Sequence, residues 1–245
     1  MQINRYTDIC KGELNMLGDN SIVRNKDRFI LMRAWMKVRK YFSRKKREKL
    51  NKEIRGKLEN VDDFTIFANN CLGGVFYHDA GRRFDSPTVN MAFDGEDFIK
   101  FCENPNAFRT KEFEFFTWPG HNYPLARING IEARFVHYHT EAECIEKWNE
   151  RFDRIHWNNI FVIATDVDGM YQEKWMERFD KLPYRKIMYT AKEYPQYDWA
   201  IRVPAFKNRN NVHILTDFAN LRGQRYYETA FDIARWIRDN SMQHI

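Results

Sequence analysis

A chain of 245 residues can form one large domain or two small ones, and its 43% hydrophobic and 16% aromatic residues allow a sizeable core. A mean hydropathy of -0.71 is typical of a soluble protein, and no apolar run is long enough to form a helix that spans a bilayer. Four widely spaced cysteines without a Cys-x-x-Cys pair exclude a zinc ribbon and predict reduced thiols. No signal-peptide-like apolar stretch follows the first residues, so we expect a cytoplasmic protein.

The formal net charge of +6 is concentrated in a predicted amphipathic helix at residues 28–57. From Arg33 to Lys57 there are twelve Lys or Arg and two Glu. Such a helix can lie on an anionic membrane surface or on a partner, or it can dock its apolar stripe on the protein's own core. Contact with nucleic acid is disfavoured, because the rest of the chain is nearly balanced in charge and holds no recognised binding motif. The stripe consists of Ile30, Leu31, Ala34, Trp35, Val38 and Phe42.

We therefore expect an N-terminal segment at residues 1–60, which contains the basic helix, and a single α/β domain at residues 61–245. In the second part strands alternate with helices, which predicts a three-layer, Rossmann-like fold with helices on both faces of a mostly parallel sheet. Within residues 127–138, Asn129-Gly130 predicts a hairpin whose second arm is a strand that ends at His137, and this hairpin makes the sheet mixed. Strands are expected at 64–68, 86–93, 111–118, 159–165, 186–190, 199–203 and 212–216, and helices at 75–81, 94–104, 140–155, around 175–179, and 226–240.

The strand at 64–68 ends in the sequence Asn69-Asn70-Cys71-Leu72-Gly73-Gly74, and a helix is expected to follow. In open α/β sheets, ligands bind at the carboxyl ends of the strands. A thiol at a helix N-terminus lies at the positive end of the helix dipole, which favours the thiolate. Cys71 is therefore a candidate nucleophile, and the substrate-binding candidates are Asn69, Asn70, Gly73, Gly74 and His78. The alternative is a buried thiol beside glycines that allow close packing.

A thiolate needs a nearby base or cation at neutral pH, and His137, at the end of another predicted strand, is the candidate base. Asp166 or Asp168 would orient its imidazole, again from a strand end. His78 and His139 are rival partners for the thiol. The alternative is that His137 is a core histidine with its hydrogen bonds satisfied.

Asp166 and Asp168 also form an Asp-x-Asp pattern after the most apolar strand. Two carboxylates so placed can hold Mg²⁺ or Mn²⁺ on the diphosphate of a sugar nucleotide, as in metal-dependent glycosyltransferases. The ion would neutralise the departing nucleotide. The competing interpretation is an ordinary turn, because Asp168-Gly169 is a common turn signal.

At these motifs the chain resembles a bacterial family of unknown function, domain of unknown function 1919, whose members are known as exopolysaccharide or capsule biosynthesis proteins. The resemblance covers residues 60–240, and a looser one to a suspected papain-like family adds weight to Cys71 and His137. The motifs are Asn69–Gly74, Ser86–Asn90, Phe135–Tyr138, Lys147–Ile155, Asn159–Ile163, Thr165–Gly169, Leu182–Tyr184 and Arg225–Tyr227.

The resemblance implies a role in surface polysaccharide biosynthesis. We expect a transferase or cysteine hydrolase that acts on a glycan precursor or nucleotide sugar, with Cys71 as nucleophile and His137 as base. The alternatives are a metal-dependent glycosyltransferase using Asp166 and Asp168, and a non-catalytic glycan-assembly or binding protein. If residues 28–57 contact anionic lipid, the protein would work at the inner face of the membrane.

Overall fold

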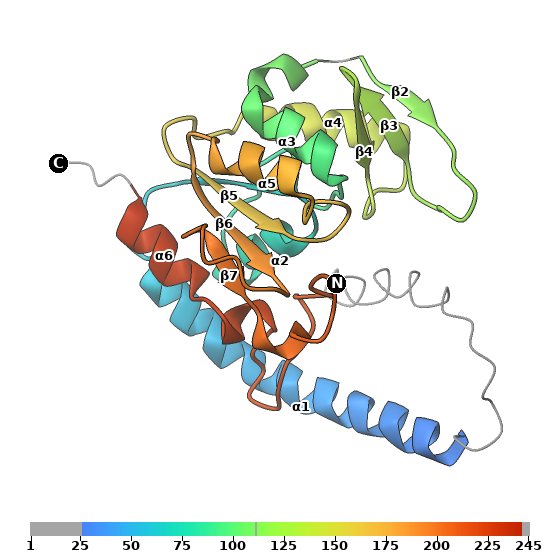
Figure 1. Cartoon of the computed structure of the whole chain (residues 1–245), viewed down its shortest axis with the longest axis vertical. Helices are drawn as coiled ribbons and strands as arrows, with labels where there is room; N and C mark the ends of the chain where they lie inside the picture. Colours follow the sequence, from blue (N-terminus) through green and yellow to red (C-terminus); the bar gives the residue numbers. More distant parts are fainter. Residues whose placement is uncertain (1–25, 111, 242–245) are drawn as a thin grey trace.

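The computed structural model describes residues 26–110 and 112–241, with side chains at Tyr41 and from Ser43 onward. A parallel sheet lies between two layers of helices, and a small antiparallel sheet packs at one end (Figure 1). The helices are α1 (Lys26–Lys57), α2 (Leu72–Ala80), α3 (Gly95–Glu103), α4 (Glu141–Phe152), α5 (Glu173–Asp180) and α6 (Ile233–Asn240). The strands are β1 (Thr65–Ala68), β2 (Glu114–Phe116), β3 (Leu125–Ile128), β4 (Ile131–Arg134), β5 (Ile160–Thr165), β6 (Arg185–Thr190) and β7 (Ala200–Arg202).

The central sheet has the strand order β1-β5-β6-β7, and all its neighbouring strands are parallel. The α/β class is therefore confirmed. Because Ala68 pairs with Ile163 and Thr165 with Tyr189, the carboxyl ends of β1, β5 and β6 lie side by side. The Asn129-Gly130 hairpin is confirmed, with φ of 46° and 82°, and it lies in a separate antiparallel sheet of β2, β3 and β4.

Side chains from the central sheet alternate between two apolar cores, as the two-residue period of a strand requires. Phe67, Val162 and Met188 face α3, α4 and α5, together with the small sheet. Ile66, Ile163 and Ile187 face α1, α2 and α6. Since both faces are covered, the strands are apolar almost throughout, and this is why they could be predicted as buried.

The second half of α1 belongs to this body. Ser43 donates to the carbonyl of Asn220 at 2.8 Å, and buried Arg47 pairs with Asp79 of α2 at 2.7 Å. The buried side chain of Ile54 continues the same docked face. The expected boundary at residue 60 thus falls just beyond a helix that shares the core of the α/β domain.

Two expected strands are absent from the described chain, and one helix is shorter. Residues 86–91 form turns, closed by the amide of Val89 on the carbonyl of Ser86, and Asn90 has a positive φ of 66° that a strand does not allow. Residues 212–216 are irregular, because the amide of Val212 donates to the carboxylate of Asp166. The last helix begins only after Asp232, which caps it by accepting from the amide of Arg235.

Candidate functional site

Cys71 lies where β1 turns into α2, at the carboxyl edge of the central sheet. The preceding residue, Asn70, holds this turn: its amide nitrogen donates to the hydroxyl of Thr165 at 2.7 Å, and its oxygen accepts from the amide of Leu72 at 3.1 Å. The amide of Val75 donates to the carbonyl of Cys71, so the helix starts at once. The thiol is half-buried and its backbone is fixed on both sides.

His137 comes from a different part of the chain, a tight turn after β4. The amide of Tyr138 donates to the carbonyl of Phe135 at 3.0 Å, which closes a four-residue turn with His137 as its third residue. Phe135 and Tyr138 are buried on either side of it, and the Tyr138 hydroxyl donates to the carbonyl of Val89 at 2.9 Å. The imidazole is therefore presented from an anchored turn.

These two segments bring Cys71 Sγ and His137 Nε2 to 3.2 Å, within hydrogen-bonding distance for sulfur. Burial lowers the pKa of His137 below its ordinary value, since the charged imidazolium is the form that loses solvation. A neutral imidazole beside a thiol is able to take its proton at neutral pH. The expected proximity of the two residues is confirmed, whereas their catalytic role remains a prediction.

Asp166 does not serve this pair. Its side chain is fully buried, and its two oxygens accept from the amides of Ala191 at 2.8 Å and Val212 at 2.7 Å. Burial raises the pKa of Asp166 to about 6, against the opposing effect of these two hydrogen bonds. The carboxylate thus joins the end of β5 to two loops instead of orienting His137.

Asp168 has separate partners. It sits in the left-handed region, with φ of 50°, and its carboxylate pairs with Arg134 at 2.8 Å. Arg134 also pairs with Asp94 at 2.8 Å, so one guanidinium bridges two carboxylates at the end of β4. Since Asp166 is committed to backbone amides and Asp168 to Arg134, the two carboxylates do not converge as a pair of metal ligands would.

The other predicted substrate-binding residues have structural contacts. Asn69 is fully buried, and its amide group both donates to the carbonyl and accepts from the amide of Thr165. Gly73 packs so closely on β1 that a Cβ there would lie 3.0 Å from the Cβ of Ala68. A Cβ on Gly74 would lie 2.9 Å from the Asn90 side-chain oxygen. The glycines therefore allow α2 to approach its neighbours, as the packing interpretation holds.

His78 is exposed near the far end of α2, where its Nδ1 lies 3.4 Å from the buried carboxylate of Asp79. It is thus about two helical turns from Cys71. His139 is exposed beyond the turn that carries His137. His137 is the histidine whose ring nitrogen lies 3.2 Å from the thiol sulfur.

Two residues that the sequence did not single out complete the support of the pair. The Thr88 hydroxyl accepts from the amide of Ala68 at 3.0 Å, and so ties the Ser86–Asn90 turns to β1. Val89, next in the chain, accepts from both Tyr138 and Arg151. The Ser-Pro-Thr-Val-Asn motif was the available signal, because a polar turn between apolar residues is unusual in a strand.

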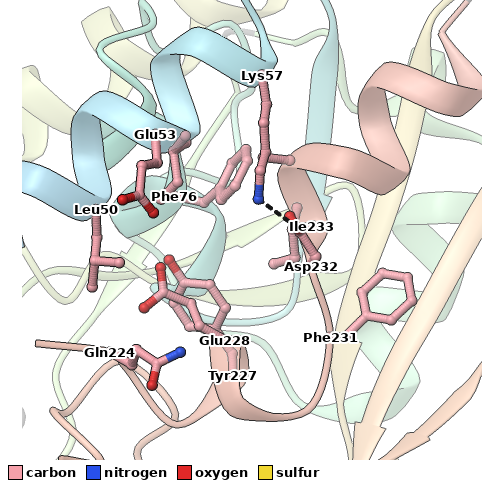
Figure 2. Close-up of a pocket in the computed structure, with 12 residues that line it drawn as sticks. Leu50, Glu53, Lys57, Phe76, Gln224, Tyr227, Glu228, Phe231, Asp232 and Ile233 are labelled. Atoms are coloured by element: carbon pink, nitrogen blue, oxygen red, sulfur yellow. Dashed lines mark hydrogen bonds and ion pairs between the residues drawn. The ribbon is translucent and has the colours of Figure 1, made fainter. Parts of the chain in front are cut away.

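Two other places that could bind a ligand lie away from Cys71 and His137. Asp63, Asp85 and His156 form a triad of possible metal ligands before β1 and β5, at the opposite edge of the sheet, but Arg83 and Arg154 already pair with Asp85 at 2.7 and 3.1 Å. A cavity of about 160 Å³ opens between α1, α2 and residues 224–234 (Figure 2). None of the predicted site residues line it.

Residues 41–238 of the chain match the domain of unknown function DUF1919, a range that runs from the second half of α1 into α6. A protein of Haemophilus influenzae named only as uncharacterized is 32% identical over 206 residues, which cover 84% of this chain and 98% of that protein. The chain therefore belongs to the DUF1919 family.

Proposed function

We propose that this protein is a cysteine-dependent transferase or hydrolase in which Cys71 is the nucleophile and His137 the general base. The observation that carries the proposal is the 3.2 Å separation of Sγ and Nε2 at the carboxyl edge of a parallel sheet. The burial that lowers the pKa of His137 supports it, because it keeps the base in its neutral, proton-accepting form.

In the proposed reaction the thiol proton of Cys71 moves to His137 Nε2 as sulfur attacks an acyl carbon. The carbonyl electron pair moves onto oxygen, and backbone amides at the start of α2 stabilise that charge. Collapse of the intermediate breaks the bond to the leaving group, which takes the proton from His137. Water or an acceptor hydroxyl, deprotonated by His137, then attacks the acyl carbon, the bond from that carbon to sulfur breaks, and His137 returns the proton to Sγ. The nature of this acceptor distinguishes a hydrolase from a transferase.

The substrate we propose is a precursor of a surface polysaccharide, handled in the cytoplasm. This part rests on the family resemblance. The two carboxylates of the alternative glycosyltransferase have separate partners, so the geometry favours the thiol chemistry.

The test is to mix the protein with an activated acyl ester and an acyl thioester and to locate any acyl adduct by peptide mass spectrometry. We expect an adduct on Cys71 that is lost in Cys71→Ser and forms far more slowly in His137→Gln. His139→Gln, a change at an exposed neighbouring histidine, is the matched control and should react normally. An adduct found equally on other residues, or none on Cys71 with either probe, would contradict the proposal.

A second measurement separates the alternatives. A rise in melting temperature with Mn²⁺ and a nucleoside diphosphate, abolished by Asp168→Ala, would favour the glycosyltransferase. Binding of oligosaccharides without any acyl adduct would favour the glycan-binding protein.

A further inference from the structure

The cavity of about 160 Å³ lies between the end of α1, α2 and the segment that leads into α6 (Figure 2). The predicted stripe residues from Ile30 to Phe42 lie in the earlier half of α1, outside the side chains that the structure describes. A cavity of about 150 Å³ is large enough for a benzene-sized molecule, so this one can hold the apolar part of a small ligand. Its inner wall is apolar and buried, and consists of Ile54, Phe76, Ile233 and Ala234.

The hydroxyl of Tyr227 adds a polar group to this wall. Tyr227 lines the cavity and is 1% exposed, and its hydroxyl has no hydrogen-bond partner among the residues that the structure describes. A buried polar group without a partner destabilises a fold, and most buried polar groups in native proteins are paired. The hydroxyl is therefore a group that a bound ligand can satisfy.

Two carboxylates with unused hydrogen-bonding capacity line the same cavity. Glu228 accepts from Arg47 at 2.5 Å and from a backbone amide at 2.7 Å, both through Oε2, and no described residue donates to its Oε1. The side chain of Glu53 has no ion pair or hydrogen bond within the described part of the chain. By contrast, Lys57 of the cavity rim is already paired with Asp232 at 2.5 Å, a pair that lies to the right of both carboxylates in Figure 2. The unbalanced charge at the cavity is therefore negative.

We propose that this cavity binds a small organic ammonium ion, whose apolar body packs on the inner wall while its nitrogen lies among the oxygens of Tyr227, Glu53 and Glu228. A primary ammonium group carries three donors and no acceptor, which suits a set of oxygens that lack donors. An inorganic cation would make no use of the apolar wall, and an anion would be repelled by the carboxylates. The proposal goes beyond the cysteine chemistry and does not depend on it, because neither Cys71 nor His137 lines the cavity.

The test is a ligand-observed NMR titration of the full chain at about pH 7 with three probes of similar size, which are protonated benzylamine, benzyl alcohol and benzoate. We expect benzylammonium to bind at least about tenfold more tightly than benzyl alcohol, and benzoate not to bind. Tyr227→Phe removes only the hydroxyl and should weaken benzylammonium binding about tenfold, and Glu53→Gln should weaken it about threefold. The matched control is Glu59→Gln, which removes the same charge from an exposed residue outside the cavity lining and should leave binding unchanged.

The stability of Tyr227→Phe tests the state of the hydroxyl itself. Because this hydroxyl has no partner in the described chain, the melting temperature of the variant without ligand should stay the same or rise. A lower melting temperature would show that the protein already satisfies the hydroxyl, which overturns the proposal. The proposal is also overturned if benzylammonium does not bind, if benzyl alcohol binds equally well, or if binding survives both cavity substitutions. An equal weakening in Glu59→Gln would assign the binding to general surface charge and not to the cavity.

Discussion

The reactivity of Cys71 toward iodoacetamide is the most direct consequence of the site geometry. The structure offers internal references, because burial raises the pKa of Cys144 to about 12 and that of Cys102 well above its usual range. At pH 7.5 a thiol with a pKa of about 12 is thiolate in about one molecule in 30,000, whereas an ordinary thiol with a pKa of about 8.5 is thiolate in about one in ten. We expect Cys71, half-buried and beside an imidazole, to react at least about a thousandfold faster than Cys144.

The assay is timed alkylation between about pH 5 and 9, followed by quantification of each cysteine peptide by mass spectrometry. Because burial lowers the pKa of His137, the rate at Cys71 should rise with pH below the range of an ordinary histidine. In His137→Gln that rise should vanish, leaving the later rise of an ordinary thiol, whereas His139→Gln should keep the wild-type profile. Labelling of Cys71 no faster than that of Cys144, or identical profiles with and without His137, would refute the reasoning.

Three further variants test the surroundings of the pair. Asp166→Asn should destabilise the fold by about 2 kcal/mol, measured by urea unfolding, because an amide group cannot accept from both backbone amides. Burial raises the pKa of Asp166 from 3.8 to about 6, so its contribution to the free energy of unfolding is fully present below pH 4 and falls by about 3 kcal/mol as the pH rises through 6. The loss of stability in the variant should therefore be larger at pH 4.5 than at pH 7.5. A loss of stability that is independent of pH would contradict this. Arg47→Met, which removes one of the two guanidinium groups that pair with the buried carboxylate of Asp79 and leaves Arg225 as the other, should cost about 2 kcal/mol. The exposed ion pair lost in Arg55→Met should cost at most about 0.5 kcal/mol, and equal losses would argue against a buried network. Gly74→Ala should lower the melting temperature, with a cost of about 1–3 kcal/mol for a Cβ placed 2.9 Å from a side-chain oxygen, while Gly56→Ala, with open space around it, should be neutral or stabilising.

The parts of the fold that the sequence predicted well are those where local chemistry decides the structure. Asn129-Gly130 demands a tight hairpin, and the capping box at Thr140 starts α4 where it was expected, with the Thr140 hydroxyl accepting from the amide of Glu143. The apolar runs of β1 and β5 are buried on both faces, which leaves little alternative to a central strand. Because both strands are parallel neighbours, the residues after them had to meet at one edge.

The predictions that are wrong concern segments whose local structure is decided by a residue far away in the sequence. Val89, Met91 and Phe93 are buried, as expected for a strand at residues 86–93. They reach the core through turns, however, and not through the hydrogen-bonded pairing of a strand with its neighbour. The amide of Val212 pairs with a carboxylate that lies 46 residues earlier in the chain, and nothing in residues 212–216 signals this. Likewise, Asp166 follows a strand as a catalytic residue would, and only the structure reveals that its two oxygens accept from backbone amides.

The polar residues around Cys71 and His137 share one physical role, which is to fix the relative position of segments far apart in sequence. Asn70 joins the Cys71 turn to β5, Thr88 joins the Ser86–Asn90 turns to β1, and Tyr138 joins the His137 turn to those same turns. Apolar packing alone would give comparable stability, since replacing buried polar groups by well-packed apolar ones is often neutral. Hydrogen bonds have a preferred geometry that apolar contacts lack, and this geometry holds Cys71 Sγ and His137 Nε2 at one separation. This network holds a half-buried thiol beside an imidazole whose pKa is lowered by burial, and a fixed separation of that kind is what the proposed nucleophile and base would need.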